Sequence, residues 1–165
     1  MAQTCIYEYG KEILPNIKSD RHYFMIHDTT SDESIIKELS LYTKIDFTQY
    51  KYKKIEREVS TGFGMKWHID DIALIKINKD KDNYKNGIVL HNKYRLFHKE
   101  ELPLYSSILY LSSNNEDFKG GEFHFVDEMI IPYKNHILLF NSKEVHRVAK
   151  VISGIRKNIL YKFYK

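Results

Sequence analysis

The sequence predicts a mainly β protein of a single domain, folded as a sandwich, a barrel or a double-sheet jelly roll. From about residue 54 onward, short runs of β-branched and aromatic residues alternate with polar turns. So many short strands in about 110 residues are typical of these folds. One amphipathic stretch near the N-terminus predicts a supporting helix. With 165 residues, 42% of them hydrophobic and 29% charged, the chain is long enough to bury a core unaided.

The first part of the chain, residues 1–54, is expected to support a jelly-roll core formed by residues 55–165. Its clearest element is a helix from Thr30 to Tyr42, because Thr30 and Glu33 have the spacing of a capping box. The apolar residues of this stretch recur on one helical face, which we expect to pack against a sheet. They are Ile35, Ile36, Leu39 and Tyr42.

The core region contains ten runs with the pattern of strands. A polar stretch from Asn78 to Asn86 separates two of them and is closed by Gly87, which makes an Asn-Gly turn signal. This stretch is either a solvated hairpin tip or a lid over a site, and the sequence leaves both readings open. The predicted strands cover residues 55–59, 63–69, 73–77, 88–97, 107–111, 122–126, 129–131, 136–140, 145–151 and 159–163.

The composition argues against several classes of protein. Cys5 is the only cysteine, so no intrachain disulfide forms and a catalytic thiol is disfavoured. No window approaches the roughly 20 apolar residues of a membrane span, and the N-terminus lacks the pattern of a secretory signal. We therefore expect an intracellular protein of the cytoplasm or nucleus, without a membrane partner. The net charge of +4 permits an acidic partner, but basic and acidic residues are interleaved, so this indication is weak.

The chemistry is expected to centre on His68 and Asp70. Side chains alternate across a strand, so these two point to the same face while Trp67 and Ile69 point to the other. One imidazole and one carboxylate lack a single nitrogen ligand to form the two-His-one-carboxylate site of non-haem Fe(II) oxygenases. His146 is the best candidate for that third ligand. Ten residues after it, an arginine offers a fork that can hold an anionic co-substrate.

Residues 58–165 resemble the 2-oxoglutarate and Fe(II)-dependent dioxygenases, and within them the prolyl-4-hydroxylase-like branch. The resemblance rests on five pieces in the family's order, so it is far more specific than an isolated His-x-Asp. The pieces are His68-x-Asp70, the strand 108–111, the Gly-Gly strand 118–125, the turn and strand 131–140, and His146 with Arg156.

The resemblance implies a double-stranded β-helix in which His68, Asp70 and His146 bind Fe(II) and form the catalytic centre. Arg156 and Tyr110 would hold the far carboxylate of 2-oxoglutarate. The implied reaction consumes O2, converts 2-oxoglutarate to succinate and carbon dioxide, and hydroxylates a substrate C–H bond, with ascorbate as an optional reductant. The favoured substrate is a protein or peptide, with proline as the target by resemblance alone.

Three positions depart from the family's pattern. Many hydroxylases have a second co-substrate tyrosine ten residues before the first histidine, where this chain has Glu58. The turn before His136 has Asn135 in place of glycine, and asparagine tolerates the left-handed conformation. Two residues after Arg156, where a small hydroxyl residue is common, stands Asn158.

Other readings stay open. An AlkB-type nucleic-acid demethylase shares the Trp-His-x-Asp-Asp form of residues 67–71 and the spacing of residues 156–162, whereas Gly120-Gly121-Glu122 is a hydroxylase feature. The short region before the core also leaves little room for a nucleotide-flipping lid. A catalytically silent jelly roll and a Zn(II) hydrolase are weaker alternatives. His124 and His136 are interpreted as structural, and Trp67 as a packing anchor.

Overall fold

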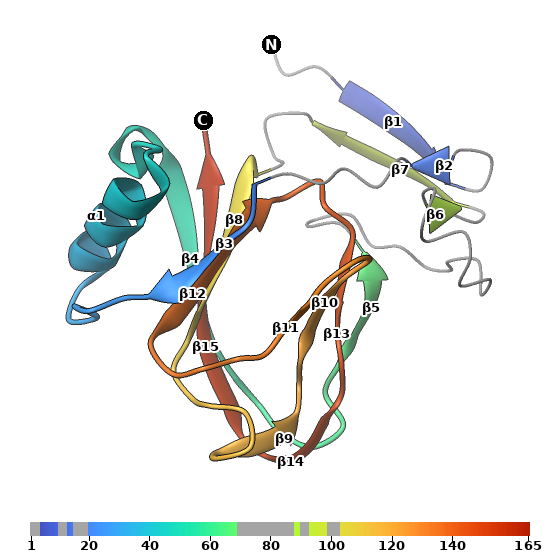
Figure 1. Ribbon diagram of the computed structural model, residues 1–165. Coiled ribbons are helices and arrows are strands. Elements are labelled where there is room, and N and C mark those ends of the chain that lie inside the picture. The colour runs from blue at the N-terminus through green and yellow to red at the C-terminus, as the bar shows by residue number, and fades with distance from the viewer. Residues whose placement is uncertain (1–3, 10–12, 15–19, 69–87, 90–92, 99–102) are drawn as a thin grey trace.

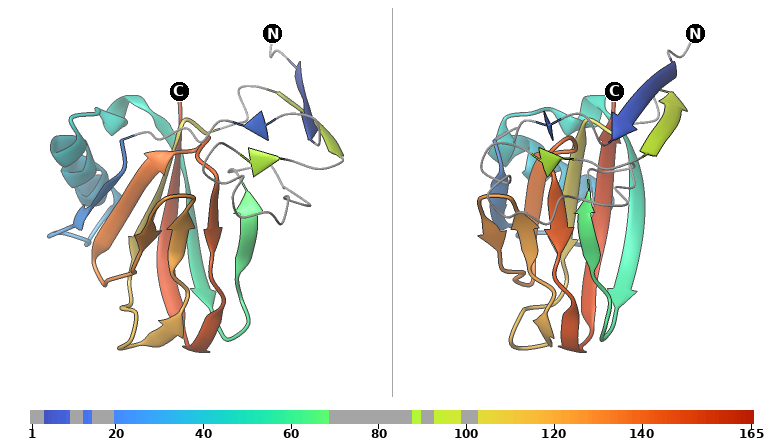
Figure 2. Two further views of the ribbon diagram at one scale, coloured as in Figure 1. Left: turned by 45° about the vertical axis from the view of Figure 1, so that its right-hand side comes forward. Right: turned by 90° about the vertical axis from the view of Figure 1, so that its right-hand side faces the viewer.

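A computed structural model describes residues 4–9, 13–14, 20–68, 88–89, 93–98 and 103–165. Two antiparallel sheets face each other across the molecule, and a helix lies against the outside of the larger sheet (Figures 1 and 2). The predicted mainly β architecture is confirmed. The predicted strand 73–77 and the polar stretch 78–86 lie outside the described residues.

The larger sheet has five strands in the order β3-β12-β8-β15-β4. In chain order these are β3 (His22–Met25), β4 (Lys51–Val59), β8 (Tyr105–Tyr110), β12 (His136–Asn141) and β15 (Arg156–Tyr164). The first of the predicted core strands thus begins at Lys51 rather than Ile55. We call the face of this sheet toward the smaller sheet its inner face, and the face toward the helix its outer face.

The smaller sheet has four strands in the order β11-β10-β13-β5. They are β5 (Met65–His68), β10 (Phe123–Phe125), β11 (Met129–Ile130) and β13 (His146–Val148). At the lower end of the molecule in Figure 1, β9 (Phe118–Gly120) pairs with β14 (Val151–Gly154). Two further antiparallel pairs are β1 (Thr4–Tyr9) with β7 (Lys93–His98) and β2 (Ile13–Leu14) with β6 (Ile88–Val89).

Helix α1 (Asp32–Thr43) begins two residues later and ends one residue later than the predicted helix from Thr30 to Tyr42. Its N-cap is Ser31, whose hydroxyl accepts a hydrogen bond from the Ser34 backbone N–H at 3.0 Å, while Thr30 bonds to Asp28 instead. The prediction of a capping box from Thr30 to Glu33 is therefore wrong. Ser31 is the N-cap because it has the extended backbone that a cap requires. After Lys44, which ends the helix in the left-handed conformation, comes the short 3-10 helix η1 (Phe47–Gln49).

The helix packs on the outer face as predicted, with one exception. Tyr42 is 59% exposed and stacks on Phe24 at a centroid distance of 3.7 Å rather than entering the core, and Thr43 is buried instead. The core between helix and sheet includes Ile35, Ile36, Leu39, Phe47, Leu109, Ile137, Leu139, Tyr161 and Phe163.

A second core lies between the two sheets. The alternate residues of β8 and β12 face inward here, so these strands are buried on both faces and read as continuous apolar runs. Each large apolar side chain buried in this way stabilises the fold by roughly 1.5–3 kcal/mol. The residues of this core are Ile108, Tyr110, Phe123, Phe125, Ile130, Leu138, Phe140 and Val148.

Among the described residues, no helix is both long and apolar enough to cross a membrane. The cellular compartment stays a prediction.

Candidate metal and co-substrate site

Two of the three predicted metal ligands lie directly opposite each other on neighbouring strands. His68 ends β5 and His146 begins β13, and the two residues are register partners in the antiparallel pair. Their ring centroids are 4.2 Å apart. The register shifts between this pair and the next one, Val148 with Met65, and such irregularities re-aim side chains next to functional sites.

The third predicted ligand, Asp70, lies outside the described residues, as does Asp71. Within the described ranges, no three His, Cys, Asp or Glu side chains gather as a metal-binding group. The assignment of Asp70 therefore rests on its position two residues after His68 in the sequence.

His146 is held with one ring nitrogen turned toward the backbone. Its Nδ1 lies 2.9 Å from the carbonyl oxygen of Glu144, a geometry in which Nδ1–H donates and Nε2 carries the lone pair with which a histidine binds a metal. The ring also stacks on Phe123 at 5.0 Å and meets Phe140 edge-on at 4.9 Å. With only 3% of the residue exposed, this packing fixes the orientation of the imidazole.

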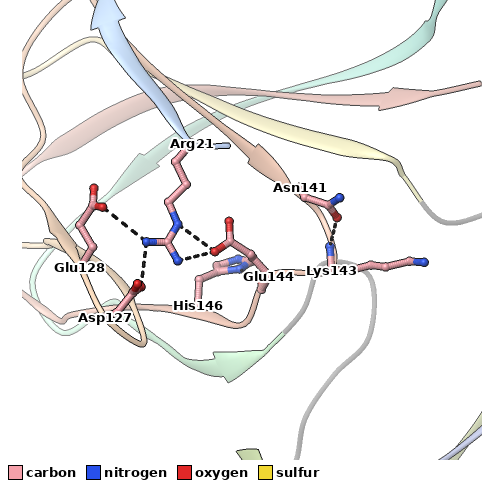
Figure 3. Close-up of polar contacts among 7 residues, drawn as sticks. All are labelled: Arg21, Asp127, Glu128, Asn141, Lys143, Glu144 and His146. Carbon is pink, nitrogen blue, oxygen red and sulfur yellow. Dashed lines mark hydrogen bonds and ion pairs between the residues drawn. The ribbon is translucent and has the colours of Figure 1, made fainter. Parts of the chain in front are cut away.

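A buried arginine ties the His146 turn to two other parts of the chain (Figure 3). Arg21, just before β3, donates from Nε and Nη2 to Glu144, with the Nε distance 2.8 Å. Its Nη1 lies 2.8 Å from Asp127 and 3.4 Å from Glu128. Its guanidinium also lies over the Phe125 ring at 3.9 Å.

The charge of Arg21 is well stabilised in this position. Burial opposes it, yet hydrogen bonds with Glu144 and Asp127 raise the pKa of Arg21 above its usual value. Sequence reasoning missed this residue because its partners are more than a hundred positions away and nothing in the local pattern marks it.

The predicted co-substrate residues meet on the inner face of the larger sheet. Tyr110 ends β8, and Asn158 lies opposite it on β15, two residues after Arg156. At most 3% of each residue is exposed. Arg156 donates from Nη1 to the carbonyl oxygen of Gly121 at 3.0 Å. The sequence did not assign Asn158 to this site, although the Arg-x-Asn spacing was the available signal.

Three polar atoms at this place have no hydrogen-bond partner within the described chain: Tyr110 Oη, Arg156 Nε and Asn158 Oδ1. Buried polar groups are nearly always paired, so three exceptions side by side indicate a ligand. A phenol and a guanidinium are donors suited to a carboxylate, and the Asn158 amide offers a donor and an acceptor depending on its orientation. The residues present therefore fit the carboxylate end of 2-oxoglutarate.

Electrostatics agree with this assignment. Burial raises the pKa of Tyr110, so the phenol stays a neutral donor. Burial also lowers the pKa of Arg156, an effect that Tyr110 opposes and the nearby charge of Arg57 increases. An arginine nevertheless stays protonated in proteins, and no carboxylate of the described residues forms an ion pair with this one.

The Gly-Gly motif lets the backbone approach this region closely. Gly120 and Gly121 have φ values of +76° and +69°. A Cβ added to Gly120 would lie 2.2 Å from the carbonyl oxygen of Lys150, and one added to Gly121 would lie 3.4 Å from Cδ of Arg156. Neither position accepts a larger residue without strain. Asn135, with φ of 65°, adopts the left-handed conformation that its substitution for glycine predicted.

The other singled-out residues lie away from these atoms. Glu58 is on the outer face, 3.4 Å from Lys157, so it does not replace the second co-substrate tyrosine. His136 contacts the rings of Tyr23 and Tyr133, as expected for a structural residue. For His124, burial and the neighbouring Arg147 lower the pKa. The side chain of Trp67 is not described.

The family model of the 2OG-Fe(II) oxygenase superfamily matches residues 50–165. The chain belongs to this superfamily. The predicted family is thereby confirmed, and with it the cofactor Fe(II) and the co-substrates 2-oxoglutarate and O2 that the superfamily uses. A role for ascorbate stays a prediction.

Relatives of this 2OG-Fe(II) oxygenase domain include "2-oxoglutarate and iron-dependent oxygenase domain-containing protein 3" from several vertebrates. The rat protein is 27% identical over 140 residues, which cover 75% of this chain and 43% of the relative. The human protein is 28% identical over 137 residues, covering 75% and 42%. The chain thus spans less than half the length of the curated relatives it matches.

Two solved structures share the fold. A viral collagen prolyl hydroxylase from Paramecium Bursaria Chlorella virus-1, solved as a 2OG complex, matches with a TM-score of 0.57 and 16% identity over 88% of this chain and 78% of that one. A Pseudomonas putida prolyl-4-hydroxylase matches with a TM-score of 0.55 and 14% identity over 87% and 72%. The jelly roll predicted for this oxygenase domain is confirmed.

Proposed function

We propose that this domain is a 2-oxoglutarate- and Fe(II)-dependent hydroxylase of peptides, with proline as the target residue. The observation that carries the proposal is the set of three unpaired buried atoms beside Arg156, on the inner face of a sheet whose facing sheet carries the paired histidines. Buried polar groups without partners destabilise a fold, so we expect them to be retained only where a bound co-substrate pairs with them.

His68, Asp70 and His146 would hold Fe(II), and Arg156 with Tyr110 would hold the far carboxylate of 2-oxoglutarate. When bound, the metal supplies the oxidising chemistry that couples decarboxylation of 2-oxoglutarate to hydroxylation of a C–H bond. The Glu144 carbonyl fixes the His146 tautomer, and the packing against Phe123 and Phe140 keeps that ring from turning. Arg156 supplies the fixed charge that orients the co-substrate, and Tyr110 donates one further hydrogen bond.

A peptide substrate is supported by the fold, since both solved structures compared above are prolyl hydroxylases. One observation favours the AlkB-type demethylase as a second candidate. Asn158 lies buried on the same face as Arg156, as expected if both residues of the Arg-x-Asn pattern serve the co-substrate. The substrate test must therefore include nucleic acid.

The test is conversion of 2-oxoglutarate to succinate by the purified protein with Fe(II), alone and with panels of proline-containing peptides and methylated oligonucleotides. We expect slow turnover alone, stimulation by peptides, and no turnover by Asp70→Ala. Stimulation by oligonucleotides alone would favour the demethylase. If the wild-type protein neither binds nor converts 2-oxoglutarate, the domain is a silent jelly roll and the proposal is wrong.

A further inference from the structure

Strand β4 carries charges of opposite sign on its two faces near the co-substrate site. On the outer face, Glu58 lies 3.4 Å from Lys157, its register partner on β15. Side chains alternate along a strand, so the neighbouring Arg57 points to the inner face. Its register partner on β15 is Asn158, which is only 3% exposed. Arg57 therefore lies on the same face as the predicted co-substrate residues.

Arg57 completes a row of three side chains on neighbouring strands. β8, β15 and β4 lie side by side in this order, and Asn158 of β15 lies directly opposite both Tyr110 of β8 and Arg57 of β4. Residues opposite each other on paired strands have Cβ atoms about 4.5–5.5 Å apart. Two members of the row, Tyr110 and Asn158, hold buried polar atoms without a partner in the described chain. The row thus runs from these buried atoms to the half-buried Arg57.

The two arginines of this region are diagonal neighbours. Arg156 lies opposite Val59, two residues along β4 from Arg57, so the two positions are about 7–8 Å apart on one face of the sheet. Burial is the main cause that lowers the pKa of Arg156, and the charge of Arg57 lowers it further. Among the described residues, no carboxylate forms an ion pair with either arginine. Two such guanidinium groups close together indicate a site for an anion.

The far carboxylate of 2-oxoglutarate can accept one more donor than the residues already assigned provide. An ionised carboxylate has two oxygens with about four positions for hydrogen bonds. Arg156, the Tyr110 hydroxyl and the Asn158 amide offer a donor for three of them. The Arg57 guanidinium, in the same row, offers a donor for the fourth and adds a second positive charge.

We propose that Arg57 is a further co-substrate-binding residue, whose guanidinium faces the far carboxylate of 2-oxoglutarate together with Arg156. This inference rests on the proposed function, because it takes the site beside Arg156 as the co-substrate site. Being half-buried, Arg57 forms the solvent side of that site and attracts the dianion from solution. It also makes the site select a 2-oxo acid with a far carboxylate over one without.

The test is titration calorimetry of the full chain loaded with Mn(II), with 2-oxoglutarate and with 2-oxopentanoate. The second compound has the same carbon chain and the same 2-oxo acid end, but no far carboxylate. We expect Arg57→Gln to weaken binding of 2-oxoglutarate by about fivefold to tenfold, as for a charge-assisted hydrogen bond that is partly exposed. Binding of 2-oxopentanoate and of Mn(II) should stay unchanged. High salt should reduce the difference between the wild-type protein and the variant.

Matched variants separate the position of the charge from its presence. Arg57→Lys keeps the charge without the planar fork and should retain part of the affinity. Lys53→Gln removes a cation from the same face of β4, about 13 Å along the strand, and should leave the affinity for 2-oxoglutarate unchanged. Without co-substrate, Arg57→Gln should not lower the urea midpoint of unfolding, since it removes a charge that repels Arg156.

Unchanged affinity of Arg57→Gln for 2-oxoglutarate, or an equal loss of affinity for 2-oxopentanoate, would overturn the inference. So would an equal loss in Lys53→Gln, because the effect would then come from overall charge. These outcomes leave the proposed function standing, since the wild-type protein still binds 2-oxoglutarate. A wild-type protein that does not bind 2-oxoglutarate would overturn both.

Discussion

Two buried arginines in this domain have opposite surroundings. Arg21, with 7% of its side chain exposed, contacts Glu144, Asp127 and Glu128 and lies over an aromatic ring. Arg156, a residue only 3% exposed, donates to a single backbone carbonyl, and its Nε has no partner among the described residues. The same type of side chain thus has three carboxylate partners in one place and, among the described residues, none in the other.

The difference separates structural from functional charge. Burying a guanidinium without a counter-ion is unfavourable, so a fold retains one only where a ligand completes it. Arg21 joins the segment before β3, the β10–β11 turn and the β12–β13 turn, and should act mainly on stability. Arg156 should act mainly on co-substrate binding. Four predictions test this contrast, from the largest expected effect to the smallest.

Arg21→Met should lower the free energy of unfolding by about 3–5 kcal/mol, because it removes the guanidinium that contacts the buried carboxylate of Glu144. Urea denaturation measures the loss. The matched double variant, Arg21→Met with Glu144→Leu, removes both charges and should recover part of it. A loss no larger than that of an exposed ion pair would mean that the Arg21 contacts contribute little to stability.

Arg156→Met should weaken 2-oxoglutarate binding by on the order of 100-fold, since charge-assisted hydrogen bonds contribute about 1.5–3 kcal/mol each. Its free energy of unfolding should change far less than that of Arg21→Met, because a poorly compensated buried charge is removed. Titration calorimetry of the Mn(II)-loaded protein, beside metal binding alone, separates the two functions. Equal losses of metal and co-substrate affinity would show that Arg156 has been misassigned.

Tyr110→Phe removes a hydroxyl that has no partner within the described chain. Stability should stay nearly unchanged, while 2-oxoglutarate affinity should fall by about threefold to tenfold, as for one neutral hydrogen bond. Because burial raises the pKa of Tyr110, its contribution should persist at alkaline pH up to that raised value. A marked loss of stability with unchanged affinity would make the residue a packing residue only.

The exposed contact of Lys54 with Asp32 should have the smallest effect. Burial by itself raises the pKa of Asp32, but hydrogen bonds from Tyr161 and Lys54 lower this pKa below the ordinary carboxyl value. A lowered folded pKa adds stability that is present above the ordinary carboxyl pKa and is lost as the pH falls through the lowered one. Asp32→Asn should make the free energy of unfolding depend less on pH in the acid range. At neutral pH the variant should lose about 0.2–1 kcal/mol of this free energy for the Lys54 pair alone. An unchanged profile would contradict the assignment.

Local pattern was sufficient for what lies on regular strands. The sequence pattern predicted the strand runs that contain Tyr110 and His146, and the order of motifs identified the superfamily. The helix was placed from its apolar spacing, although its cap shifted from Thr30 to Ser31 because neighbouring hydroxyl residues are equally competent in sequence. Pairing of Arg21 with Glu144 depends on tertiary proximity that no local rule encodes.

The charge asymmetry of β4 was missed for a different reason. Lys and Arg are interleaved with acidic residues along β4, which reads as a neutralised stretch. On a strand, however, interleaving with period two separates the signs onto opposite faces. The weak charge signal of the linear sequence therefore conceals a strongly asymmetric strand.

That asymmetry makes β4 unusually sensitive to insertions and deletions. Losing or gaining one residue inside the strand would exchange its faces and turn Glu56 and Glu58 inward while Arg57 turned outward. Amino-acid composition and net charge would barely change, yet the polarity of the inner face of β4 would invert. Among homologues of this domain, length in β4 should therefore be more strictly maintained than the identity of any single residue within it.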